Sequence, residues 1–151
     1  MSDWIDDVVK RETEVFEMED ADRERKNSII MQAAELFVGL MQAVEDAVYR
    51  INAPVLERDK LTSLTFSSQS VTSFGVVSGK SDPIVVLIVT NKYDHFAVSR
   101  GPIIPDESHK EHKENITIDM DDNRKIFMRT QEGQGLNLQD AVKYLLQPLV
   151  S

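Results

Sequence analysis

Hydrophobic residues recur at helical spacing from the start of the chain. Between residues 4 and 16 the large apolar side chains fall mostly three and four positions apart, with Glu12 interrupting them; they are Trp4, Ile5, Val8, Val9, Val15 and Phe16. Within the charged stretch that follows, Glu19 and Asp22 precede Arg23 and Lys26 by four positions, a spacing that supports a solvated helix surface. The pattern predicts a charged helical arm over residues 1–26.

Residues 29–51 predict a second helix that is apolar nearly all round. Most of its polar positions form one narrow stripe, consisting of Gln32, Glu35, Gly39, Gln42, Asp46 and Arg50. A helix of this kind has to be covered on more than one side. We therefore expect a buried helix that packs on a sheet and also on the first helix, the last helix or another subunit.

The join between these two segments allows two structures. One unbroken helix from residue 4 to residue 51 would be about 70 Å long, whereas a domain of this size has a radius of gyration of about 15 Å. Apolar residues in the second segment are spaced as in a coiled coil. If the same spacing is extended towards the N-terminus, the core positions are the charged residues Lys26, Arg23 and Glu19, which disfavours a long coiled coil. We expect a bend near Asn27 and Ser28, the alternative being an arm that reaches another subunit. Pro54 should end the helical region.

Residues 61–130 change to the pattern of strands. Alternating or continuous apolar runs separated by turn residues predict about six mostly antiparallel strands, near residues 64–66, 71–77, 84–90, 93–100, 116–120 and 124–130. A final amphipathic helix is predicted over residues 137–149, with Asn137 as its N-cap and Pro148 ending regular helix in the last turn. The predicted fold is one α+β domain over residues 1–151, with N-terminal helices packed on the sheet and a C-terminal amphipathic helix.

Charge and composition narrow the function classes. The chain has 17 Lys and Arg against 26 Asp and Glu, a net charge of -9, and its basic residues are interleaved with acids. Affinity for nucleic acids and anionic membranes depends on clustered positive charge, so neither is an expected partner. The acidic start lacks the basic flank and apolar stretch of a secretory signal, and the aliphatic run at 84–89 is too short to span a bilayer, so we expect a cytoplasmic protein.

Three histidines are the weak metal candidates, namely His95, His109 and His112. His109 and His112 lie in a stretch that alternates lysine with glutamate and matches no two-histidine helical motif, so a solvated loop is favoured and no metal or other cofactor is expected. Asp119, Asp121 and Asn123 begin like a calcium-binding loop, but Arg124 and Thr130 stand where glycine and glutamate are required. A hairpin turn explains the same residues.

The remaining motifs favour a non-catalytic role over an enzyme. Gly133 and Gly135 lack the third small residue of a dinucleotide fingerprint, and Gly79-Lys80-Ser81 lacks the first glycine and the following helix of a phosphate loop. No serine lies in a nucleophile elbow. Two triplets could be assembled on paper, one from Ser99, His95 and Asp94 and the other from Ser108, His109 and Asp106, but composition alone does not define a catalytic triad.

These observations favour a non-catalytic protein–protein interaction module or chaperone-like adaptor, which we expect to form a homodimer. Its interaction surface is predicted on Trp4, Ile5, Val8, Val9 and Phe16. The alternative is a small-ligand-binding protein or an unassigned enzyme with a cavity between sheet and helices. In size, acidity, mixed α and β content and last helix the chain resembles bacterial secretion chaperones. Those chaperones interleave a helix among their strands, however, and no specific residues match, so no function follows from the resemblance.

Overall fold

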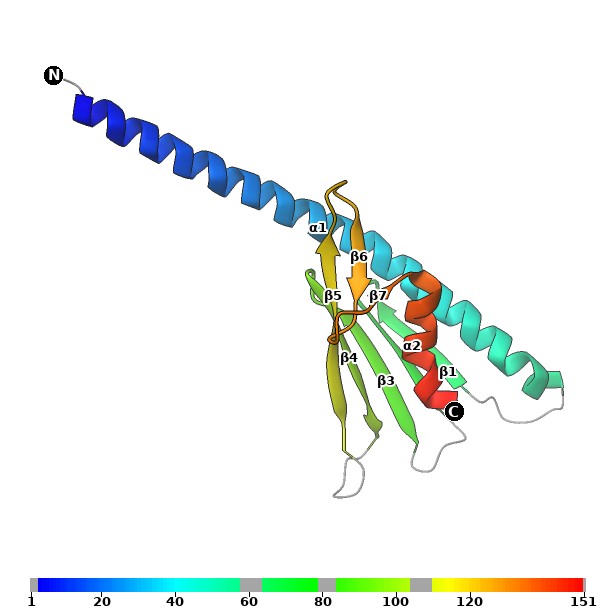
Figure 1. The fold of residues 1–151 in the computed structure, drawn as a ribbon. Helices are drawn as coiled ribbons and strands as arrows, with labels where there is room; N and C mark the ends of the chain where they lie inside the picture. Colours follow the sequence, from blue (N-terminus) through cyan, green and yellow to red (C-terminus); the bar gives the residue numbers. More distant parts are fainter. Residues whose placement is uncertain (1–2, 58–63, 79–83, 104–109, 151) are drawn as a thin grey trace.

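The computed structural model describes residues 3–57, 64–78, 84–103 and 110–150, which form two helices and seven strands (Figure 1). In chain order the elements are α1 (Asp3–Glu57), β1 (Leu64–Ser70), β2 (Ser73–Ser78), β3 (Val85–Asn91), β4 (His95–Pro102), β5 (His112–Met120), β6 (Ile126–Arg129), β7 (Gly135–Leu136) and α2 (Leu138–Val150). The predicted α+β class is confirmed. The prediction of about six strands was approximate, because β7 has only two residues and leaves no periodic pattern in the sequence.

The seven strands form one antiparallel sheet in which neighbours in sequence are neighbours in space. Alternate side chains point to one face, as the pleat of a strand requires. In the pairing of β2 with β3, Phe74 lies opposite Val89 and Val76 lies opposite Leu87, and all four side chains are buried. The inward-facing residues of β4 and β5, such as Phe96 and Ile116, continue the same buried surface.

Both helices pack on that buried face and share one hydrophobic core with it. Phe37 of α1 lies at its centre, fully buried, with its ring centroid 5.4 Å from that of Phe74 and 5.0 Å from that of Phe96. Leu145 of α2 is also fully buried. The helix predicted over residues 29–51 therefore has the sheet and α2 as its two partners.

The expected bend near Asn27 and Ser28 is wrong, because α1 is a single helix of 55 residues, about 80 Å long. Neither glycine nor proline occurs between Asp3 and Val38, so nothing in this stretch forces the helix to end. Asn and Ser favour helix starts without excluding helix interiors. Figure 1 shows the consequence: the first half of α1 projects beyond the sheet, and the second half crosses it.

Two details of the α1 prediction also need correction. The segment 29–51 is buried only on the side that faces the sheet and α2, while Met31 and Tyr49 are exposed on the other side. The helix also continues past Pro54 to Glu57. Proline removes the N–H that would bond the carbonyl of Arg50, and this is tolerable because Arg50 lies on an exposed part of the helix.

Two amide side chains tie the sheet to α1. Gln32 bonds the β6 region through its Nε2, 3.0 Å from the carbonyl of Arg124, and its Oε1, 3.3 Å from the N–H of Ile126. The buried Asn52 bonds both the carbonyl and the N–H of Leu64, at 2.7 and 3.0 Å. These contacts attach α1 at both ends of its packed half, and Gln32 fixes where the free half departs.

The last helix begins as predicted, since the side chain of Asn137 accepts a hydrogen bond from the N–H of Asp140 at 2.7 Å. Its end differs from the prediction. Pro148 does not stop α2, which runs to Val150. The reason lies in a polar cluster on the neighbouring strands, described below.

Candidate functional site

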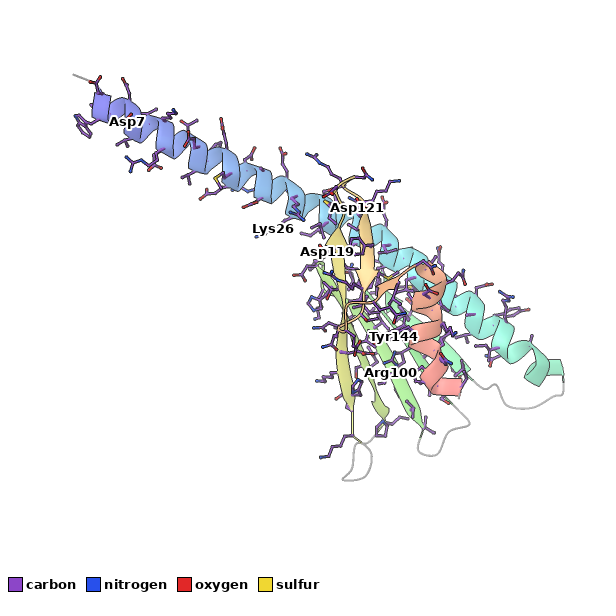
Figure 2. All side chains as sticks on the ribbon, in the orientation of Figure 1. Asp7, Lys26, Arg100, Asp119, Asp121 and Tyr144 are labelled. Carbon is purple, nitrogen blue, oxygen red and sulfur yellow. The ribbon has the colours of Figure 1, made fainter. Side chains whose placement is uncertain are left out.

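The candidate site is the projecting part of α1, residues 3–27, which we call the arm. Every residue of the arm is exposed (Figure 2). It is about 37 Å long. Seven large apolar side chains lie on it with exposed fractions between 42% and 69%, and these are Trp4, Ile5, Val8, Val9, Val15, Phe16 and Met18. An apolar surface of this kind usually marks a site of association.

The predicted surface residues all lie on the arm, and helix geometry places them on two separate strips. At 100° per residue, Trp4 and Val8 share one strip, and Val15 and Met18 continue it. Ile5, Val9 and Phe16 form the second strip, about 120° around the helix, with Glu12 and Glu19 between the two. Val15 and Met18 were not among the predicted surface residues, although the same helical spacing identifies them.

The charged residues of the arm are also without partners in this structure. Glu19–Arg23 and Asp22–Lys26 have the four-residue spacing of helix ion pairs, but among the described residues no arm side chain forms an ion pair. The arm therefore carries both apolar groups and charges that are available to a partner.

A stretch of α1 is long and apolar enough to cross a membrane by length and composition. The core helix of a water-soluble protein can have the same length and apolar composition. The most apolar part of α1 is residues 29–51, and there Ala33, Phe37, Leu40 and Val44 are fully buried against the sheet and α2. Core packing accounts for the hydrophobicity of that side of the helix, whereas Met31 and Tyr49 on the other side are exposed.

A cluster of polar side chains, which the sequence did not predict, joins β4, β5 and α2. The guanidinium of Arg100 forms an ion pair with the carboxylate of Glu114, and the Tyr144 hydroxyl donates to the other oxygen of that carboxylate at 2.5 Å. The side chains of Arg100 and Glu114 are only 12% and 8% exposed. Figure 2 shows Arg100 and Tyr144 beside each other, where they line a hollow of about 480 Å³.

Arg100 also explains why α2 can contain a proline. In a regular helix the N–H of residue 148 would bond the carbonyl of Tyr144, and proline has no N–H. The Nη2 of Arg100 donates to that carbonyl at 2.8 Å. The arginine thus replaces the missing backbone donor and lets the helix continue through Pro148.

The cluster shifts the pKa of two of its members. Burial alone would raise the pKa of Glu114, but hydrogen bonds from Tyr144 and Arg100 and the positive charge of Arg100 outweigh it and lower the pKa below 4.5. Burial and the carboxylate of Glu114 raise the pKa of Tyr144 to about 12. An ionised Glu114 and a neutral Tyr144 therefore form the stable pair at neutral pH.

These shifts predict a pH dependence of stability. Because the pKa of folded Glu114 is lowered, its contribution is present above pH 4.5 and is lost as the pH falls through the lowered value. Because the pKa of folded Tyr144 is raised, its contribution is present below pH 10 and is lost as the pH rises towards about 12. Urea unfolding at a series of pH values measures both losses.

Tyr144→Phe should lower stability by about 1.5 kcal/mol at pH 7 and should reduce the loss of stability at alkaline pH. If the alkaline loss is unchanged in this variant, it does not come from Tyr144.

The described histidines lie far apart. His95 pairs with Thr117 and His112 with Arg100, five positions away along the strands and on opposite faces of the sheet, a separation of about 17 Å. His109 lies outside the described residues, and within those residues no three potential ligands come together. His95 instead contacts Asp94 at 2.6 Å.

The residues of the calcium-loop and triad candidates make turn and side-chain contacts within the sheet region. Asp121 accepts hydrogen bonds from the N–H groups of Asn123 and Lys125 at 2.8 and 3.0 Å, which confirms a turn at that place. Asp119 pairs with Arg129 at 2.5 Å. The first triplet assembled on paper was Ser99, His95 and Asp94. Ser99 instead donates a hydrogen bond to Glu111 and lies four positions from His95 along β4, so these three side chains do not form a catalytic triad. The second triplet includes Ser108 and His109, and it lies outside the described residues together with Gly79-Lys80-Ser81.

Comparison with known proteins adds no identification. No protein-family model matches the sequence. Searches of curated proteins and of solved structures also find no match.

Proposed function

We propose that this protein is a non-catalytic protein–protein interaction module, a chaperone-like adaptor whose docking surface is the apolar side of the arm. The observation that supports the proposal is the exposure of that surface: Trp4 and Phe16 are 69% and 68% exposed, on the half of α1 that projects beyond the sheet (Figure 1). The expected partner is a protein, including a second copy of the chain, and the expected compartment is the cytoplasm. Burying one such side chain contributes about 1.5–3 kcal/mol to association.

The stability of the arm supports the same function. An isolated helix in water is marginal unless its apolar face packs against something, because most helix stability in proteins comes from tertiary contacts. The arm is helical over its whole length, and the described residues leave every arm residue exposed, without such a contact. A protein that covers the arm supplies the missing packing.

The alternative, a ligand cavity between sheet and helices, finds less support. The centre of that interface is occupied by the rings of Phe37, Phe74 and Phe96, with centroids 5.0–5.4 Å apart for the two contacts of Phe37. The hollow beside Arg100 and Tyr144 is open to solvent, and Arg100 and Glu114 are already engaged with each other.

Two acidic substitutions test the proposal. Val8→Asp with Phe16→Asp places charges on the apolar side, and we expect it to weaken association by at least ~3 kcal/mol, more than a hundredfold. Thr13→Asp with Ala21→Asp adds the same charge elsewhere on the arm and serves as the matched control. All four positions are exposed, so each variant should unfold within about 0.5 kcal/mol of the wild type.

The measurements are sedimentation velocity of the purified chains and capture of proteins from a lysate of the source cells. Association by the wild type and the control, with loss in the Val8/Phe16 variant, supports the arm as the docking surface. If the Val8/Phe16 variant associates as strongly as its control, the surface is elsewhere and the proposal is wrong.

A further inference from the structure

When one strip of the arm is reversed onto a second copy of itself, three of its four pairs of positions join two apolar residues or two opposite charges. Positions 4, 8, 11, 15, 18, 22, 25 and 29 alternate steps of four and three and so lie along one side of α1. The apolar members are Trp4, Val8, Val15, Met18 and the half-buried Ile29; the charged members are Arg11, Asp22 and Arg25. We call this set the arm seam.

From this order we infer that the arm binds a second copy of itself in an antiparallel pair, a conclusion that rests on the proposed function and names its partner. With residues i and 33 − i facing each other, Trp4 meets Ile29 of the second copy and Val15 meets Met18. Arg11 meets Asp22, its opposite charge, while Val8 meets Arg25, the one pair that joins an apolar side chain to a charge. Every contact occurs twice because the pair is symmetric.

The charges nearest the two ends of the arm favour this direction. Asp3, Asp6 and Asp7 lie near the free end, and Arg23, Arg25 and Lys26 lie near the base, where they alternate with Asp22 and Glu24. Figure 2 shows Asp7 and Lys26 at these opposite ends. An antiparallel pair brings the three aspartates of each arm to the three basic residues of the other. A parallel pair in register sets Arg11 on Arg11 and Asp22 on Asp22, and like charges facing each other oppose binding.

The seam also ends at a suitable place on the folded domain. A hollow of about 360 Å³ lies between the base of the arm and the turn from β5 to β6, and Asp22, Arg25, Ser28 and Met120 are among the residues that line it. Asp22 and Arg25 belong to the seam as well. In the antiparallel pair, Trp4 of the second copy lies beside Ile29, next to this hollow. The two sheets then lie at opposite ends of the paired arms.

Disulfide trapping tests the direction of pairing directly, because the chain has no cysteine of its own. Val8→Cys and Arg25→Cys are prepared separately, mixed under reducing conditions and then oxidised. In the antiparallel pair, position 8 faces position 25. Two copies of position 8 are then 17 residues apart along the seam, about 25 Å, far beyond the ~7 Å that a disulfide can bridge.

The expected result is a covalent dimer from the mixture and none from either variant alone. Disulfide dimers from each variant alone would show parallel pairing and overturn the inference. A chain that sediments as a monomer at every concentration, while the Val8/Phe16 double substitution still abolishes capture of another protein, would overturn self-pairing and leave the proposed function standing.

Charge reversal gives an independent readout. Arg11→Glu alone and Asp22→Arg alone each set like charges against each other at two places in the pair, and each should raise the dissociation constant at least about a hundredfold. The chain that carries both substitutions restores opposite charges and should dimerise again. Failure of the combined variant to recover, with unfolding unchanged, would contradict the pairing of Arg11 with Asp22.

Discussion

Phe37→Ala is expected to destabilise the protein by about 3–5 kcal/mol, because the substitution leaves a cavity at the centre of the core. The ring is fully buried and contacts those of Phe74 and Phe96. In a domain of this size such a loss lowers the melting temperature by about 10 °C. Thermal and urea unfolding, followed by circular dichroism, measure it.

Phe16→Ala is the matched control, since it makes the same substitution in the same helix at a position that is 68% exposed. It should change the stability of the isolated chain by no more than about 0.5 kcal/mol. Equal losses for the two variants would mean that the arm packs against the domain, contrary to the structure. A much larger loss of stability for Phe37→Ala than for Phe16→Ala would show that one half of α1 packs on the domain and the other half does not.

Arg100→Met is expected to cost about 3 kcal/mol, because it leaves the carboxylate of Glu114 in a largely buried position without its cation. The carbonyl of Tyr144 also loses the donor that replaces the absent N–H of Pro148. Pro148→Ala supplies a backbone donor to that carbonyl. Arg100→Met should therefore cost about 1 kcal/mol less in a Pro148→Ala background.

Two further measurements test whether Arg100 both neutralises Glu114 and replaces the missing donor of Pro148. Arg100→Met combined with Glu114→Gln removes both charges and should recover much of the lost stability, because an unpaired buried charge is the larger penalty. If the cost of Arg100→Met is the same with alanine or proline at position 148, Arg100 does not act as the substitute donor. Urea unfolding of the wild type, Arg100→Met, Pro148→Ala and the variant with both substitutions completes the cycle for positions 100 and 148.

The sequence predicted most of the sheet and the capped start of the last helix because these features have local causes. Strand alternation at 116–120 and the Asn137 cap depend on neighbours within a few residues. The unbroken α1 was missed because Asn27 and Ser28 suit both a helix start and a helix interior. Only the absence of glycine and proline before Gly39 indicated that the helix continues.

The polar cluster could not be predicted in the same way. Arg100 and Glu114 are 14 positions apart and Tyr144 is a further 30, and only the pairing of β4 with β5 and the packing of α2 bring them together. One signal was present in the sequence: a proline inside an otherwise good helix requires a donor from elsewhere. The arm is the opposite case: its apolar residues and charges could be identified directly in the sequence, and the structure adds that the described part of the chain leaves all of them exposed.

Whether a second copy covers the arm can be measured by the accessibility of Trp4 to a neutral quencher. Trp4 is the only tryptophan and lies near the free end of the arm, so acrylamide quenching of its fluorescence reports on the docking surface alone. We predict that Trp4 is protected at high protein concentration, becomes accessible on dilution, and stays accessible at all concentrations in the Val8→Asp/Phe16→Asp chain. If wild-type Trp4 is as accessible at every concentration as Trp4 of the Val8→Asp/Phe16→Asp chain, the claim that a second copy covers the arm is contradicted.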